Sequence, residues 1–259
     1  MSKPRVAVHK FSSCDGCQLS ILNLEDELLD LVDAIEIAYF LEASSHIQKG
    51  PYDIALVEGS ITTEHEVERI QKIREESDIL IAIGTCATAG GIQALRNFSN
   101  ANEMADFTYD HPEYLHYLEK STAIADHTKV DLELWGCPVN KYQLLEVIVA
   151  LLQQRRPNLP THSVCLNCKR NGTVCVMITN GEPCAGPVTR TGCGAICPSA
   201  GRGCYGCFGP APSADVGTLV PRLQKLERYP GETVNLLRNF AGYAPQFRDA
   251  VDNILKEEA

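Results

Sequence analysis

The distribution of cysteines constrains this chain more than any other sequence feature. Twelve of its 259 residues are cysteines, and eight of these fall between positions 165 and 207. The first residues carry no positively charged region followed by an apolar run, so we expect no export signal and a cytoplasmic protein. Because cytosolic thiol buffers keep cysteines reduced, we expect metal or redox chemistry here in place of disulfides.

Charge and hydropathy exclude two classes of partner. Lys and Arg together number 23 and Asp and Glu 33, which gives a net charge of −10 with no basic stripe, so nucleic acid is not an expected partner. The longest apolar stretches, such as residues 144–152, are far shorter than the roughly 20 residues that a membrane span requires. We therefore expect no membrane association.

The first half of the chain alternates two patterns. Short apolar runs predict strands, and stretches with apolar residues at helical spacing predict helices. The expected strands are 5–8, 35–40, 54–57, 79–83 and 132–135, and the expected helices are 18–32, 63–76 and 141–154. Continuous apolar runs are typical of strands covered on both faces, so we predict an α/β fold with a parallel sheet. The polar, His-rich segment 97–128 has no clear period and is expected to leave the sheet as a long excursion.

A change of composition predicts a domain boundary. Residues 155–160 read Arg-Arg-Pro-Asn-Leu-Pro, which is typical of a linker and divides the chain into domains 1–156 and 157–259. In residues 164–212, cysteine, glycine and proline dominate and no period persists. Such a segment buries too little apolar surface to fold alone, so we expect an inserted metal group to hold it. Three helix-like stretches follow residue 219, so the second domain is predicted to be irregular with C-terminal helices.

The four early cysteines follow predicted strands. Cys14 and Cys17 come after the first strand, Cys86 after the fourth and Cys137 after the fifth. In an open α/β sheet, loops at the carboxyl ends of strands converge on a ligand-binding crevice, so these four thiols are expected to meet and hold one 4Fe-4S cluster. The alternative is a thioredoxin-like dithiol at Cys14 and Cys17. Cys86 and Cys137 argue against it, because a dithiol needs no further pair.

The eight late cysteines are enough for two more 4Fe-4S clusters without remainder. Zinc is the competing interpretation, because Cys165 and Cys168, like Cys204 and Cys207, form C-x-x-C pairs. These two pairs lie further apart than the roughly 15 to 20 residues of a zinc ribbon, and four more cysteines separate them. The spacing therefore favours iron–sulfur clusters.

Five motifs give the chain a resemblance to a known family. They are Cys14-Asp-Gly-Cys17, Val57-Glu-Gly-Ser60, Gly84-Thr-Cys86-Ala-Thr-Ala-Gly-Gly91, Gly136-Cys-Pro-Val-Asn140 and the block from Pro183 to Cys207. Together they resemble the small subunit of NiFe hydrogenases, and most closely the cytoplasmic sulfhydrogenase delta type. The small subunits of hydrogenases that reduce coenzyme F420 or serve heterodisulfide reductase are also similar. A related subunit of respiratory complex I is less similar, because it has adjacent cysteines and one cluster.

The resemblance implies a flavodoxin-like first domain and a ligand set for three clusters. The proximal cluster would take Cys14, Cys17, Cys86 and Cys137; the medial cluster Cys193, Cys197, Cys204 and Cys207; and the distal cluster Cys165, Cys168, Cys175 and Cys184. His162, three residues before Cys165, resembles a histidine ligand of the exported relatives. A ligand role for it would leave one cysteine spare, so the all-cysteine set is favoured.

The resemblance also implies function and partners. The chain would conduct electrons between the H2-cleaving site of a NiFe hydrogenase large subunit and FAD- and NAD(P)-binding iron–sulfur diaphorase subunits. It contains no nickel-site motif, and no histidine, serine or carboxylate set in it indicates catalysis. Three roles are open for Glu58: a proton relay, a hydrogen bond to a cluster thiolate, and a purely orienting carboxylate. The alternative in a different class is a free-standing ferredoxin-like carrier.

Overall fold

The computed structural model describes residues 3–257. The chain divides into two compact units, the first ending at Asn158 and the second starting at Leu159.

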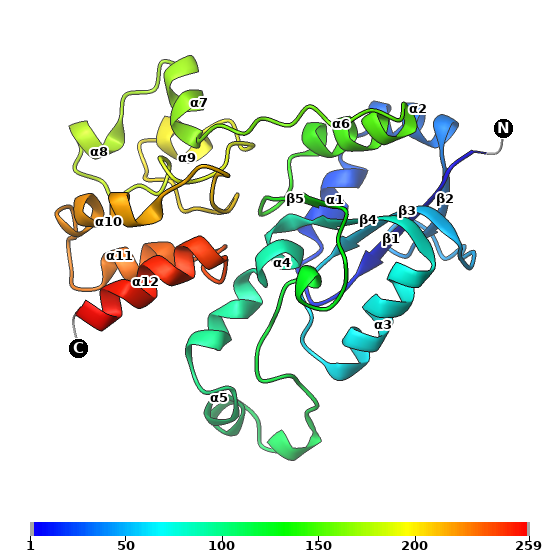
Figure 1. The fold of residues 1–259 in the computed structure, drawn as a ribbon, viewed down its shortest axis with the longest axis horizontal. Helices are drawn as coiled ribbons and strands as arrows, with labels where there is room; N and C mark the ends of the chain where they lie inside the picture. Colours follow the sequence, from blue (N-terminus) through cyan, green and yellow to red (C-terminus); the bar gives the residue numbers. More distant parts are fainter. Residues whose placement is uncertain (1–2, 258–259) are drawn as a thin grey trace. The chain divides into compact units, whose positions relative to one another are not determined.

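The first unit is built on a five-stranded parallel sheet (Figure 1). Its strands are β1 (Arg5–Lys10), β2 (Glu36–Phe40), β3 (Tyr52–Glu58), β4 (Ser77–Ile83) and β5 (Leu132–Leu134). All neighbours pair in parallel, in the order β2-β1-β3-β4-β5. This is the flavodoxin-like order, so the expected fold class is confirmed.

Helices cover both faces of the sheet. Figure 1 shows α3 (Glu64–Glu75) on one side and α1 (Gly16–Leu22), α2 (Asp26–Ala34) and α6 (Lys141–Leu152) on the other. Thr63 starts α3 with a capping box to Glu66, and Asn140 starts α6 by accepting bonds from two backbone N–H groups. The core on the α3 side is made by Phe11, Ala55, Val57, Ile61, Ile70, Ile73, Leu80, Ala82, Ala87 and Ile124. Burial on both faces explains the continuous apolar runs of the strands.

The segment expected to form a single helix over 18–32 forms two helices in the structure. The expectation of a single helix over 18–32 is wrong, because α1 ends at Leu22 and α2 starts only at Asp26. Leu24, between them, is fully buried, and Glu25 takes a positive φ of 56°. The apolar spacing of the sequence continues through this point, but packing of Leu24 into the core turns the chain and interrupts the helix.

The excursion after β4 contains short helices. They are α4 (Gly84–Ala89), η1 (Ile92–Phe98), α5 (Ala101–Thr108), η2 (Pro112–Tyr114) and η3 (Ile124–Asp126). The side chain of Asn97 closes the excursion with a reciprocal pair of bonds: Nδ2 donates to the Ser121 carbonyl at 2.7 Å, and Oδ1 accepts from the Ser121 N–H at 2.8 Å. The segment is thus an ordered part of the first unit.

The second unit combines an irregular cysteine-rich segment with C-terminal helices. Its helices are α7 (Val164–Arg170), α8 (Val176–Thr179), α9 (Ile196–Ser199), α10 (Val216–Gln224), α11 (Glu232–Leu237) and α12 (Pro245–Glu257). Helices α10, α11 and α12 pack on one another and bury Leu223, Leu237, Phe247 and Val251. The segment between residues 171 and 215 has only the short α8 and α9.

His9 is a buried histidine on β1. His9 is 5% exposed, and the centre of its ring lies 4.4 Å from that of Tyr39, with the two rings tilted by 31°. Neither ring nitrogen has a hydrogen-bond partner among the described residues. Burial, followed by the charge of Arg69, lowers the pKa of His9 from its ordinary 6.5 to about 3. Between these values the unfolded chain binds a proton that the native chain does not. The titration of His9 therefore does not reduce the free energy of unfolding above about pH 6.5. It reduces that free energy progressively as pH falls from 6.5 toward 3.

We expect His9→Phe to weaken the acid sensitivity of the protein. Each pH unit below 6.5 costs the native protein up to about 1.4 kcal/mol through His9 alone, and the variant lacks this cost. Anaerobic thermal unfolding at pH 5.5 and 7 measures the difference. The control is His65→Gln, which changes an exposed histidine on α3. Equal pH slopes in His9→Phe and the unmodified protein would contradict the prediction.

Candidate iron–sulfur centres

The four early cysteines lie at the carboxyl edge of the sheet. Cys14 is in the loop after β1, Cys17 is in the first turn of α1, Cys86 is in α4 directly after β4, and Cys137 follows β5. A Cβ built on Gly16 would lie 3.4 Å from the Cys14 Sγ and 3.5 Å from the Cβ of Pro138, the neighbour of Cys137. Residues from the ends of β1 and β5 thus come together.

The electrostatic effects of these thiols on one another also indicate that they lie near one another. Burial raises the pKa of Cys86 to about 12, and the charges of Cys137 and Cys14 add to the effect. Burial likewise raises the pKa of Cys17, with smaller contributions from Glu58, Cys86 and Cys137. Cys17, Cys86 and Cys137, whose pKa values are raised in this way, gain most from a cationic metal group, which stabilises the thiolate form.

Glycines leave room for two of the four sulfurs. Gly84 has a φ of +86°, and a Cβ there would overlap the Cys17 Sγ. Gly91 has a φ of +60°, and a Cβ there would overlap the Cys86 Sγ and lie 2.8 Å from the Cys86 Cα. Both glycines are required for their backbone conformation and for the space beside a sulfur.

Glu58 orients the start of α1. Its side chain is buried; Oε1 accepts the Cys17 N–H at 3.0 Å and Oε2 accepts the Gln18 side-chain amide at 2.9 Å. Burial raises the pKa of Glu58, although these two bonds act in the opposite direction. These contacts support the orienting role, since Glu58 holds the backbone of Cys17, one of the four candidate ligands.

Gln93, on η1, was missed by the sequence analysis. Its side-chain amide donates to the Ser12 carbonyl at 2.9 Å and also interacts with the Cys86 thiol, whose pKa it lowers. A hydrogen bond to a cluster sulfur is one of the devices that set a cluster's potential. The one sequence signal for this contact is that Gln93 lies seven residues after Cys86, just beyond the motif that ends in Gly91.

In the second unit, four cysteines group around α7 and α8. Cys165 and Cys168 are on α7, Cys175 is the N-cap of α8, and Cys184 is in the following loop. Burial raises the pKa of Cys165 to about 11, and the charges of Cys184, Cys168 and Cys175 contribute. The Cys184 Sγ accepts the backbone N–H of Cys204 at 3.1 Å and that of Gly186 at 3.4 Å. Backbone N–H groups aimed at a sulfur are typical of iron–sulfur sites.

The other four late cysteines form two pairs whose members act electrostatically on each other, Cys193 with Cys197 and Cys204 with Cys207. Cys193 raises the pKa of Cys197, secondary to burial, while the charge of Arg202 lowers it. Cys207 has the same effect on Cys204, again after burial. Cys193 also acts on Cys168, and Cys197 on Cys184, so the eight thiols form one continuous group. Their division into medial and distal sets stays a prediction.

His162 is engaged with neighbours in the linker. Its Nδ1 lies 3.1 Å from the Ser163 carbonyl oxygen, and its Nε2 lies 3.4 Å from Nη1 of Arg170. These contacts are those of a histidine that fixes the start of α7.

Among residues 3–257, no three His, Cys, Asp or Glu side chains converge as donors to one metal ion. The donor chemistry fits iron–sulfur clusters: twelve reduced thiols, N–H groups directed at sulfur, and glycines where a Cβ would displace one.

Residues 14–151 match the family described as NADH ubiquinone oxidoreductase, 20 kDa subunit. The chain is 36% identical to sulfhydrogenase 2 subunit delta of Pyrococcus furiosus over 92% of its own length and 99% of that protein. It belongs to this family, in its branch of NiFe hydrogenase small subunits. The expected resemblance is thereby confirmed, and the chain is an electron-transfer subunit of an oxidoreductase.

Two further comparisons support the assignment. A subunit of the F420-non-reducing hydrogenase vhu of Methanocaldococcus jannaschii is also 36% identical, with 79% of this chain and 81% of that protein covered. The solved structure of an NAD+-reducing [NiFe]-hydrogenase in the H2-reduced state matches with 27% identity and a TM-score of 0.56, covering 61% of this chain and 96% of the other. Within the described part of this hydrogenase subunit, none of the helices has the length and apolar character to cross a membrane.

Proposed function

We propose that this hydrogenase subunit carries three 4Fe-4S clusters and passes electrons between the H2-cleaving site of a NiFe large subunit and NAD(P)-linked diaphorase subunits. The observation that carries the proposal is the gathering of Cys14, Cys17, Cys86 and Cys137 at one sheet edge from separate strand ends. Oxidation of H2 gives two protons and two electrons. The large subunit carries that chemistry, because this sequence has no nickel-site motif.

The division of labour follows the two units. The first unit would hold the proximal cluster, and the second the medial and distal clusters, with the ligand sets expected from sequence. One-electron transfer is the chemistry that these clusters supply when bound. The chain itself supplies thiolate ligands, excludes water by burying Cys17, Cys184 and Cys204, and directs backbone N–H groups at sulfur. Such hydrogen bonds and burial set cluster potentials.

The nicotinamide acceptor is supported by the NAD+-reducing hydrogenase among the similar structures. The second candidate is the acceptor of the heterodisulfide-linked hydrogenases, whose small subunits the sequence also resembles. The M. jannaschii relative is described as F420-non-reducing, so it lends no support to coenzyme F420. H2-driven reduction of NAD+, NADP+, coenzyme F420 and, with heterodisulfide reductase added, a heterodisulfide by the purified complex discriminates between the acceptors. The same proposal places the complex in the cytoplasm, where twelve thiols stay reduced.

We expect the anaerobically purified chain to contain about twelve iron atoms and as many sulfides, four for each cysteine quartet. Iron, sulfide and zinc analysis with a visible absorption spectrum measures this content. About four irons together with zinc would contradict the assignment of the second unit.

The partner proposal has its own test. A tagged copy of this chain should copurify with a NiFe large subunit from the native organism. A stable monomer with all its clusters and no large subunit would favour the free-standing carrier instead.

A further inference from the structure

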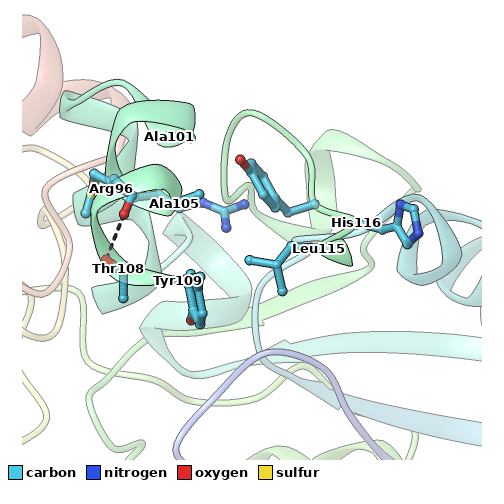
Figure 2. Close-up of a pocket in the computed structure, with 9 residues that line it drawn as sticks. Arg96, Ala101, Ala105, Thr108, Tyr109, Leu115 and His116 are labelled. Carbon is cyan, nitrogen blue, oxygen red and sulfur yellow. Dashed lines mark hydrogen bonds between the residues drawn. The ribbon is translucent and has the colours of Figure 1, made fainter. Parts of the chain in front are cut away.

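The excursion after β4 encloses a cavity that the electron-transfer role does not use. The cavity measures about 380 Å³ and lies between η1, α5 and the segment that follows η2 (Figure 2). Arg96, Met104, Ala105, Tyr109, Leu115 and Tyr117 are among its lining residues. A volume in this range holds one or two side chains of a partner or a small ligand.

Arg96 brings an unpaired positive charge to this cavity. Figure 2 shows its guanidinium pointing into the space between α5 and Leu115. Nη2 donates to the Leu118 carbonyl at 2.9 Å, and the group lies 5.9 Å from the centre of the Tyr117 ring. Its Nε is buried without a hydrogen-bond partner in the range 3–257, and no ion pair to Arg96 is found there. A guanidinium carries five N–H donors, so most of its capacity is unused.

No carboxylate in the described part of the first unit serves as the counter-ion of Arg96. Glu66 is the acidic residue whose charge acts on Arg96, and it is already engaged. Its Oε2 accepts from the N–H groups of Thr62 and Thr63 at 2.7 and 3.1 Å, and its Oε1 accepts from the Ser12 hydroxyl at 3.3 Å. Burial lowers the pKa of Arg96, which shows that its charge is partly desolvated. A desolvated cation without a counter-ion favours binding of an anion.

The surroundings of the cavity are apolar and exposed. Phe107 is 92% exposed and Met104 47%, both on α5. Large exposed apolar residues gather in this part of the chain: Ile92, Leu95, Met104, Phe107, Tyr109, Tyr114 and Leu115, here called the excursion surface. Exposed apolar groups of this kind mark protein interaction sites, and an arginine among aromatic residues is a frequent centre of binding energy.

The excursion surface adjoins the proximal thiols within the first unit. Helix η1 carries Arg96 together with Gln93, which interacts with Cys86 and bonds to Ser12, two residues before Cys14. Helix η1 therefore links the proximal thiols to the excursion surface, and a subunit bound over those thiols would be within reach of both. The catalytic partner is that subunit in the proposed function.

We propose that the cavity is a docking site for a segment of the hydrogenase large subunit that carries a carboxylate beside apolar side chains. The carboxylate pairs with Arg96, and the apolar side chains pack on Met104, Phe107 and Tyr109. This inference rests on the proposed function, because it takes the large subunit as the occupant. It adds which surface is used and which chemistry recognises it.

A photo-crosslinking experiment on the intact complex tests the occupant. A benzophenone amino acid in place of Phe107 should crosslink to the large subunit, and mass spectrometry should find Asp, Glu or a C-terminal carboxylate in the captured peptide. The control carries the same probe at Leu29, which is 65% exposed on α2, and should give at most a weak crosslink. Capture of a diaphorase subunit or a second copy of this chain, or of a large-subunit peptide without a carboxylate, would overturn the inference.

A double-mutant cycle tests the ion pair. Arg96→Met and the Asn or Gln variant of the captured carboxylate should each raise the Kd between the two subunits by about 30-fold or more, as for one partner of a desolvated pair. The double variant should bind much more tightly than the product of the two single losses predicts. Arg96→Met also loses the bond to Leu118, and the cycle separates that effect because it remains when the carboxylate is absent. Fully additive losses would overturn the pairing.

The two proposals fail differently. A complex that assembles and reduces NAD(P)+ with H2 but shows neither crosslink nor coupling would refute the docking site and leave the function standing. Absence of any complex with a large subunit would refute the proposed function, and the docking site with it.

Discussion

Gly84→Ala is expected to remove the proximal cluster while leaving the two clusters of the second unit in place. At a φ of +86° the new Cβ would overlap the Cys17 Sγ, so the sulfur has to leave its position. The left-handed backbone adds about 1 kcal/mol of strain. Iron should fall from about twelve to about eight per chain. Iron and sulfide analysis with electron paramagnetic resonance of the reduced protein measures the loss, and H2-driven NAD(P) reduction should stop.

Gly172→Ala is the matched control. Gly172 also has a positive φ, +68°, but a Cβ there meets no atom within 4 Å. This variant therefore carries similar backbone strain without touching a sulfur, and it should keep its full iron content. If Gly84→Ala also kept about twelve irons, the proposed position of the proximal cluster would be wrong.

Cys197→Ala is expected to convert the medial centre from 4Fe-4S to 3Fe-4S. A cubane needs one terminal ligand for each iron, and the fourth thiolate of the proposed set comes from Cys197 on α9. Cys193 influences the pKa of Cys197, which supports their sharing a site. Loss of one thiolate removes negative charge, so the potential of the centre should rise. Electrons should then reach NAD(P) more slowly, while H2 activation on the large subunit is retained.

The electron paramagnetic resonance spectrum of the oxidised protein checks this conversion, since only the variant should show a 3Fe-4S signal. Ile196→Ala is the control, because Ile196 is the exposed neighbour of Cys197 on the same short helix. A stoichiometric 3Fe-4S signal in the unmodified protein, or no change in the variant, would exclude Cys197 as a ligand. His162 would then be the first candidate to enter the set.

The limits of prediction are clearest at the proximal site. Cys14, Cys86 and Cys137 could be placed after strands because apolar runs identify buried strands and a motif directly follows each run. The positions of Glu58 and Gln93 could not be foreseen in the same way. Glu58 bonds to the backbone of Cys17, 41 residues away, and that contact depends on the packing of β3 beside β1.

By itself, the sequence determined the fold class, the strands of the sheet and the chemistry of the thiols, because each follows from residues close together in the chain. The tertiary structure alone decided the strand order, the break between α1 and α2 at buried Leu24, and the unpaired charge of Arg96 in its cavity. The physical reason is the same for all three. A local sequence pattern indicates which residues of a segment are buried. The groups that contact a buried residue come from distant segments, which only tertiary packing brings together.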